Sequence, residues 1–189
     1  MSPYPSQIDR DSIVRVAREM IEEEGVDHLS LNKLASEMGV KAPSLYRYVS
    51  NKAELLRAVN TVTNDRLFDV FSETLARSPD DPSERLLALA MAYRRFAHAN
   101  PRTYQLLFTT PDLRPDEDLL VRMVLPIQAI MADLSGEERS LSALRGILAL
   151  MHGFVMLELN DQLRRGGSLE EAYVQSVEAY LAGVLATGR

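Results

Sequence analysis

The sequence predicts an all-α protein of about nine helices. Apolar residues recur at helical spacing in successive segments from residue 9 to residue 185, and no run of alternating β-branched residues indicates a strand. Ser, Asp or Asn precedes many of these segments as a helix cap, and Gly or Pro separates them. The length of 189 residues accommodates a small domain and a larger one.

The N-terminal part is predicted to hold three short helices and the start of a long one. Gly25 ends the first helix, Ser30 caps the second, and Gly39 turns the chain toward a third helix that begins at Pro43. A capping-box pattern at residues 51–54 starts the fourth. The expected spans are approximately 9–24, 31–38, 43–49 and 51–77.

Five further helices are predicted over the rest of the chain. Asp81 and Ser168 stand at two of their starts, Gly166 and Gly167 end the eighth, and Pro126 is expected to kink the seventh. The expected spans are approximately 82–99, 101–108, 116–134, 137–165 and 169–185. We therefore predict a small N-terminal domain over residues 1–52 and a larger helical domain over residues 53–189.

The net charge of −6 hides an uneven distribution. Residues 1–66 carry nine Lys and Arg against ten Asp and Glu, whereas residues 67–189 carry 12 against 17. All three lysines, Lys33, Lys41 and Lys52, fall within 20 residues, and the segment 33–57 has a net charge of +3. A local positive field is what phosphate binding needs, although a chance cluster on a solvated face would give the same count.

Several classes of protein are disfavoured by the sequence. The chain has no cysteine, which excludes disulfides and thiolate metal sites, and its three histidines show no ligand spacing, so we expect neither metal nor cofactor. No nucleophile elbow, phosphate-cradling glycine loop or zinc motif indicates an enzyme, and Glu158 and Asp161 are interpreted as a solvated helix face. Without a targeting segment or membrane span, the protein is expected in the cytoplasm.

Residues 29–52, LSLNKLASEMGVKAPSLYRYVSNK, have the pattern of a helix-turn-helix. Leu34, Ala35, Val40 and Leu45 are expected to pack two short helices together around the glycine turn. Hydrogen-bond donors, among them Lys41 and Arg47, are left outside around the second helix. A short helix of this kind can enter the major groove of DNA and carry polar side chains to the base edges.

This stretch resembles the DNA-binding helices of the TetR (tetracycline repressor) family. The similarity lies in a capped second helix, an L-A-x-x-x-G-V turn, a small residue with proline, L-Y-x-[HY]-[FV] and a final N-K, and it covers about residues 9–60. The segment 145–158 also resembles a branch with an aromatic-x-x-His-Gly signature, here His152-Gly153 followed by Leu157-Glu158, although the chain has no tryptophan.

The resemblance to the DNA-binding helices implies a role for ten residues of the segment 29–52. Ser30, with the start of the second helix, would face a phosphate, and Tyr46, Tyr48 and Lys52 would contact phosphates. Asn32 could pair with adenine and Arg47 with guanine, each giving about 1–3 kcal/mol of discrimination. The remaining positions from which bases or adjacent backbone would be touched are Lys41, Ala42, Pro43 and Ser44.

The resemblance further implies that residues 53–189 bind a small molecule and form a homodimer. Large apolar side chains of this part are candidates for lining a pocket for a hydrophobic or aromatic effector, although such stripes also form plain core. These candidates are Tyr93, Phe96, Tyr104, Phe108, Met123, Met151, His152, Val155 and Met156. Leu141, Leu144, Leu148 and Met151, with the apolar face of the last helix, are expected to build a four-helix dimer interface.

The function predicted from these features is that of a repressor. As a dimer it would bind a pseudo-palindromic operator, double-stranded DNA, and release it when the effector binds. Three alternatives stay open at this point: an activator, a regulator that binds DNA only with a co-ligand, and a protein-interaction module that uses the helix-turn-helix as a scaffold.

Overall fold

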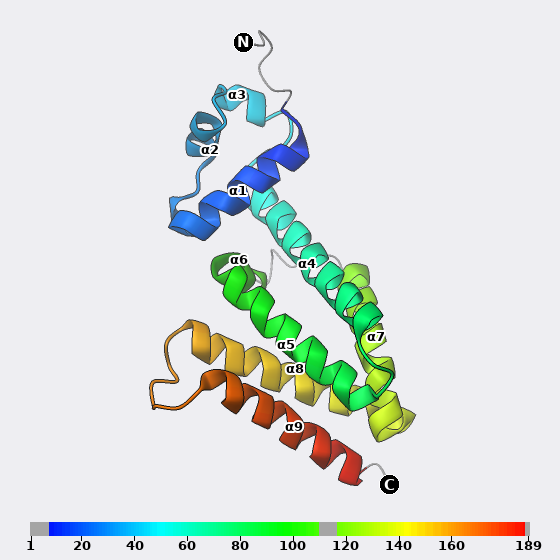
Figure 1. Cartoon of the computed structure of the whole chain (residues 1–189). Coiled ribbons are helices and arrows are strands. Elements are labelled where there is room, and N and C mark those ends of the chain that lie inside the picture. The colour runs from blue at the N-terminus through cyan, green and yellow to red at the C-terminus, as the bar shows by residue number, and fades with distance from the viewer. Residues whose placement is uncertain (1–7, 110–116, 188–189) are drawn as a thin grey trace. The chain divides into compact units, whose positions relative to one another are not determined.

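The computed structural model describes residues 8–109 and 117–187, without the side chains of residues 117–120, 122 and 123. Within these ranges the chain is helical, with nine α-helices, one 3₁₀ turn and no strand, which confirms the predicted fold class (Figure 1). The α-helices are α1 Arg10–Glu24, α2 Leu31–Glu37, α3 Ala42–Leu45, α4 Lys52–Arg77, α5 Pro82–Ala99, α6 Pro101–Thr109, α7 Glu117–Ser135, α8 Glu137–Leu159 and α9 Leu169–Thr187.

The chain forms two compact units. Unit 1 contains residues 1–65 and 100–115, and unit 2 contains residues 66–99 and 116–189, so α4 is shared between them. Helix α6 therefore groups with α1, α2 and α3, although sequence reasoning placed it in the domain over residues 53–189. The functional division at residue 52 stays a proposal, because compactness does not assign DNA or ligand binding to either unit.

The core of unit 1 is an apolar cluster that joins α1, α2, α3, the first turns of α4 and one residue of α6. Ile13, Leu34, Leu45 and Leu55 are completely buried in it, and Leu106 is the contribution of α6. Burial of each such side chain stabilises the fold by about 1.5–3 kcal/mol. The two short helices α2 and α3 depend on this packing, since helices of four and seven residues are not stable alone.

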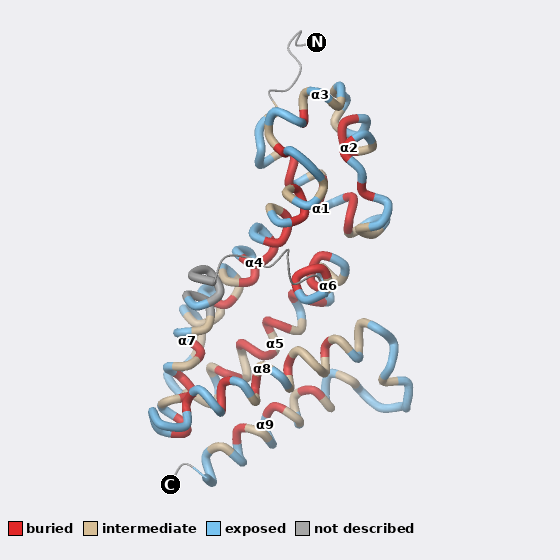
Figure 2. Tube along the Cα trace, turned by 180° about the vertical axis from the view of Figure 1, so that it is seen from behind, coloured by how far each residue is buried: buried red, intermediate tan, exposed pale blue. Residues whose placement is uncertain are grey.

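Unit 2 is an array of helices in which α7 packs on α8, and α5 and α9 contact both. Buried, intermediate and exposed residues alternate along α8 and α9 (Figure 2). Leu144 and Met151 of α8, and Tyr173, Val177 and Leu181 of α9, are buried within the unit itself. The expectation that Leu144 and Met151 face a dimer partner is therefore wrong, because both side chains are already buried in the core of unit 2.

Helix α8 ends at Leu159, six residues before the predicted end at Arg165. Asp161 adopts a left-handed conformation with φ +52°, its amide donates to the Glu158 carbonyl at 3.0 Å, and the Gln162 amide donates to the Leu157 carbonyl at 2.8 Å. These two bonds form a Schellman motif, in which Asp takes the place that glycine usually has. The predicted end is therefore wrong, because Gly166 and Gly167 are a stronger stop signal in the sequence than Asp161 is.

Gly146 allows α8 and α9 to approach closely. A Cβ atom at this position would lie 2.1 Å from the Tyr180 hydroxyl, which donates a hydrogen bond of 2.7 Å to the Ala143 carbonyl. We expect Gly146→Ala to lower the free energy of unfolding by about 1–3 kcal/mol, because Tyr180 must give up this bond. Gly153→Ala on the same helix is the control, since its Cβ would meet nothing within 4 Å. Equal results for the two variants in urea unfolding would contradict this account.

Candidate nucleic-acid interface

The turn between α2 and α3 is built around Gly39. Its φ of +68° is accessible to glycine, its amide donates to the Ser36 carbonyl at 3.0 Å, and the Val40 amide donates to the Ala35 carbonyl at 2.9 Å. These bonds end α2 in a Schellman motif and redirect the chain within two residues. The predicted helix-turn-helix is present, with Leu34 and Leu45 buried at its centre.

The second helix of this pair is shorter than the predicted span of 43–49. Helix α3 ends at Leu45, and residues 46–48 continue as turns in which the Tyr48 and Val49 amides both donate to the Leu45 carbonyl, at 2.9 and 3.0 Å. The sequence pattern does not distinguish this tightened turn from a further turn of α-helix. Lys41 stands before α3 in extended conformation, and Pro43 lies in its first turn.

All ten predicted DNA-binding residues lie in unit 1, between Ser30, the N-cap of α2, and Lys52, the first residue of α4. Those with exposed side chains are Ser30, Asn32, Lys41, Pro43, Tyr46 and Arg47, and those half-buried are Ala42, Ser44, Tyr48 and Lys52. Tyr46 is 54% exposed, which is unusual for so large an aromatic side chain. Within the described part of the chain neither Lys41 nor Arg47 has an ion-pair partner, so both cations are available to an anion.

Two of the predicted phosphate ligands also bond within the protein. The Tyr48 hydroxyl donates to the Ile8 carbonyl at 2.7 Å, and the Lys52 ammonium donates to the Val26 carbonyl at 2.8 Å. These bonds tie the segment after α3 to the start of α1 and to the 3₁₀ turn at Val26–His28. They give both residues a structural role beside the DNA contact, which stays a prediction.

Ser30 and Lys33 are likewise placed by local bonds. The Ser30 hydroxyl accepts from the Lys33 amide at 3.1 Å, which is the predicted cap of α2. The Lys33 ammonium pairs with the Glu24 carboxylate of α1, and this hydrogen bond lowers the pKa of Glu24. The pair fixes α1 against α2 on the exposed surface, so Lys33 adds less free positive charge to this face than the sequence suggested.

Family models match both parts of the chain. The model described as bacterial regulatory proteins of the tetR family matches residues 13–59, and the model of a tetracyclin repressor-like C-terminal domain matches residues 86–180. The chain belongs to the TetR family. Its assignment to the branch with the His-Gly signature stays a prediction.

Curated relatives of this TetR protein cover most of its length. YobS of Bacillus subtilis, an uncharacterized HTH-type transcriptional regulator, is 32% identical over 92% of this chain and 91% of its own. Rv0681 of Mycobacterium tuberculosis, described in the same words, is 35% identical over 82% of this chain and 72% of its own. The protein is thus a helix-turn-helix transcriptional regulator, and its family is one of regulators, not of enzymes.

Solved structures show the same fold at lower identity. A protein of unknown function from Rhodococcus sp. RHA1 superposes with a TM-score of 0.79, at 24% identity, over 97% of this chain and 98% of that one. TetR from Acinetobacter baumannii AYE gives a TM-score of 0.72, at 20% identity, over 96% and 99%. The TetR fold therefore extends over both units of the chain.

The predicted effector-binding residues are distributed over both units. Tyr104 and Phe108 belong to unit 1, with ring centroids 5.1 Å apart, and the others belong to unit 2. Tyr93, Phe96, Tyr104, Met151 and Val155 are buried, His152 and Met156 are half-buried, and Phe108 is exposed. The Met123 side chain lies outside the described residues. Their contact with an effector stays a prediction.

A cluster of charged residues in unit 2 was missed by sequence reasoning. Arg94 on α5 donates to both oxygens of Glu158 on α8, with a distance of 3.0 Å from Nε, and reaches Glu170 on α9 at 3.3 Å. His98 Nε2 lies 2.9 Å from the same Glu158 carboxylate, whose side chain is only 5% exposed. The interpretation of Glu158 as part of a solvated face is therefore wrong. Of the two residues interpreted in this way, Asp161 is the exposed one.

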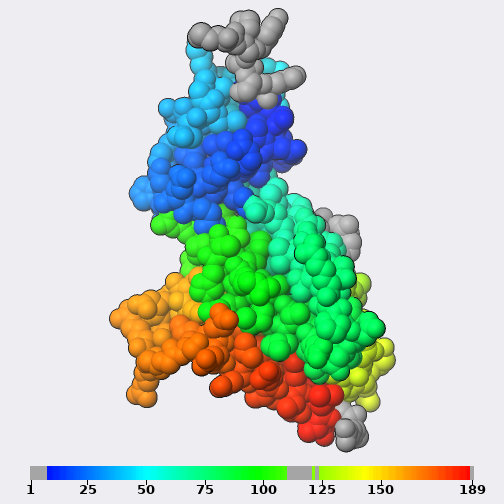
Figure 3. Space-filling model, viewed as in Figure 1, coloured from blue at the N-terminus to red at the C-terminus, as the bar shows by residue number. Residues whose placement is uncertain are grey.

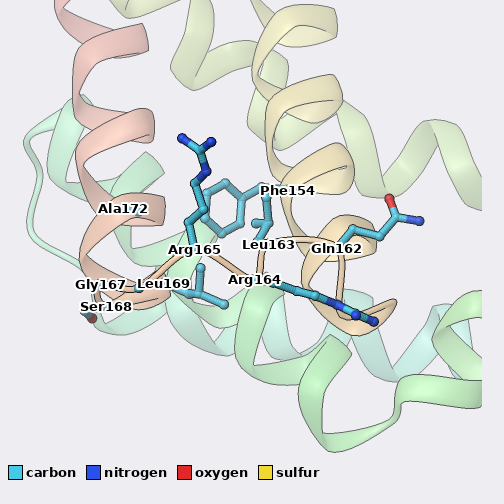
Figure 4. A pocket seen from close by; sticks show the side chains of 10 residues that line it. Phe154, Gln162, Leu163, Arg164, Arg165, Gly167, Ser168, Leu169 and Ala172 are labelled. Carbon is cyan, nitrogen blue, oxygen red and sulfur yellow. The ribbon is translucent and has the colours of Figure 1, made fainter.

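A cavity of about 430 Å³ lies where α8 and α9 are joined, with Phe154 at its apolar wall (Figure 4). The side chain of Arg165 extends beside Phe154, and Arg164 is paired with Asp161. None of the nine predicted effector-binding residues lines this cavity. In the described part of the chain, no group of three His, Asp or Glu side chains could hold a metal ion.

Acidification should destabilise unit 2 in two steps. Burial lowers the pKa of His152 in the folded protein below that of the unfolded chain. Below about pH 6.5 the unfolded chain therefore binds a proton at this imidazole more readily than the folded protein does, and the stability falls. Burial alone would raise the pKa of Glu158, but its hydrogen bonds and charge interactions with Arg94 and His98 outweigh this and lower it. The stabilisation from Glu158 is therefore lost only below about pH 4.3.

Melting curves between pH 7.5 and 5.5 test the first step. His152→Gln should show a smaller loss of Tm over this interval than the unchanged protein, because the variant has no imidazole to protonate at this site. Equal losses in the two proteins would show that His152 does not contribute to the acid sensitivity.

Proposed function

We propose that this protein is a cytoplasmic repressor that binds a pseudo-palindromic operator as a homodimer and releases it when a small hydrophobic or aromatic molecule binds. The observation that carries the proposal is the group of exposed donors around α3, above all Lys41 and Arg47, which have no ion-pair partner among the residues that the structure describes. Lys and Arg side chains neutralise phosphates, and a bidentate arginine can identify guanine in the major groove. The acidic remainder of the chain orients this face toward DNA by repulsion.

Helices α8 and α9 support the dimer. By length and composition α8 is the one described helix that could cross a membrane, with a mean hydropathy of 1.5, yet only 33% of that stretch is buried within the chain. Helix α9 lies uncovered on the surface of unit 2 (Figure 3), and Leu141, Leu157 and Leu185 are 41–44% exposed on the two helices. A second copy would cover these side chains, as the two-fold symmetry of most homodimers allows.

The effector is proposed from the aromatic and Met side chains of the core. ActR of Streptomyces coelicolor, similar in fold, was solved with (S)-DNPA, and a TetR variant of A. baumannii was solved with minocycline. By analogy, the present chain would bind its own effector among residues such as Phe96, Met151 and Val155. Binding of effector and of operator would then oppose one another by the same factor, typically about 5–150-fold.

Selection of bound sequences from a random DNA pool by the purified protein tests this function. We expect an inverted repeat to be enriched, bound by two copies of the chain, with an affinity that falls steeply as salt is raised, because phosphate contacts release counterions. Absence of any enriched sequence would contradict the proposal and favour an interaction module. Binding that appears only after a small molecule is added would show that the small molecule promotes DNA binding and does not release the operator.

A further inference from the structure

Three consecutive glutamates, Glu22, Glu23 and Glu24, end helix α1. Carboxylates at the C-terminal end of a helix oppose its dipole, and α1 has no basic residue in its last turn. A locally unfavourable choice of this kind indicates that the residues serve a contact outside their own helix. The structure shows such a contact for two of them, since Glu24 pairs with Lys33 of α2 and Glu22 binds α6.

Glu22 caps helix α6 from a distance of about 80 residues in sequence. Its carboxylate accepts from the backbone amide of Arg102 at 3.1 Å, from the backbone amide of Thr103 at 2.9 Å and from the Thr103 hydroxyl. The Arg102 guanidinium donates a hydrogen bond of 3.0 Å to the Glu22 backbone carbonyl. Four hydrogen bonds thus join the end of α1 to the first turn of α6.

The residue before α6 also contacts α1. Asn100 is of a type that caps helices well, and its side-chain oxygen accepts from Arg18 of α1 at 3.5 Å. The first-turn amides of Arg102 and Thr103 have the Glu22 carboxylate as their acceptor. Thr103 is completely buried, and Leu106 one turn later belongs to the core that holds α2 and α3.

We propose that Glu22 is a positioning residue that couples the first turn of α6 to the DNA-binding helices, so that operator binding and ordering of this turn favour one another. Helix α6 then belongs to the DNA-binding unit in function as well as in packing. By reciprocity, any event that separates α6 from α1 weakens operator binding by the same factor. This inference rests on the proposed function, because it needs an operator.

Amide hydrogen exchange in α6, with and without the selected operator duplex, tests the coupling. In the unchanged protein we expect the operator to slow exchange of the Arg102 and Thr103 amides by about fivefold or more. Glu22→Ala should abolish this operator-dependent slowing. Glu23→Ala is the matched control, since it removes the same charge from an exposed neighbouring position and should keep the slowing.

The comparison separates coupling from simple stabilisation. A cap that only stabilises α6 would alter exchange equally in free and bound protein, and the ratio of the two rates would not change in Glu22→Ala. Thr103→Val removes one of the four bonds and should reduce the ratio partly, which keeps the test informative if Glu22→Ala folds poorly. Operator binding without slowing in the unchanged protein would overturn the inference and leave the proposed function intact, whereas failure to find an operator would overturn both.

Discussion

Replacing Arg94 by methionine is expected to lower the free energy of unfolding by about 3–5 kcal/mol. The Glu158 carboxylate, which Arg94 holds through two hydrogen bonds, would then stay buried without its arginine partner, and His98 would be its remaining described contact. The effect far exceeds the contribution of an exposed ion pair, which is about 0–1 kcal/mol. Arg94 also lies 6.0 Å from the centre of the Tyr173 ring, so packing between α5 and α9 is lost as well.

Urea unfolding of two comparison variants makes this result specific. Arg95→Met removes the same group from the next, exposed position and should be nearly neutral. The double variant Arg94→Met, Glu158→Met should recover much of the loss, because it leaves no unpaired carboxylate in the interior. If Arg94→Met and Arg95→Met are equally stable, the ion pair is not the element that holds α5, α8 and α9 together.

Arg47→Ala is expected to remove discrimination at one base position of each half-site. A bidentate arginine–guanine contact contributes about 1–3 kcal/mol, which corresponds to about 5–150-fold in affinity for each helix-turn-helix of the dimer. The side chain is exposed and outside the core of unit 1, so the stability of the protein should not change. The variant should therefore bind all sequences about equally at that position.

Titration of operators that differ at each base position measures this effect. Lys52→Ala is the comparison. It should weaken binding to all sequences alike and reduce the slope of log affinity against log salt concentration by about one for each helix-turn-helix. Its melting temperature must be recorded too, because Lys52 also donates to the Val26 carbonyl. Unchanged base preference in Arg47→Ala would show that this arginine does not read the operator.

Helix starts could be predicted from the sequence because their signals are local. Asp81 accepts from the amides of Ser83 and Glu84 at 2.9 and 3.0 Å, and Ser168 accepts from the Glu171 amide at 3.2 Å, as the capping patterns predict. The helix-turn-helix was predicted for the same reason, since cap, turn glycine and apolar spacing all lie within 24 residues of one another.

What could not be predicted depends on contacts between distant residues. Glu22 and Thr103 are 81 positions apart, and Arg94 and Glu158 are 64 apart, so no local pattern pairs them. The early end of α8 was missed for a different reason, because Asp161 in a left-handed conformation carries a weaker signal than the glycines after it. Only a run of carboxylates such as Glu22–Glu24 at a helix end offered a hint of a long-range contact.

The central claim, that two copies of the chain read two half-sites together, is tested most directly by comparing the affinity for the complete inverted repeat with that for an isolated half-site at one salt concentration. The account predicts that the complete repeat binds two chains, with an affinity about 10³-fold or more above that of the half-site. The reason is that the second helix-turn-helix of the dimer then binds at a high effective concentration. Equal affinities for the two duplexes, with one chain on each, would contradict it.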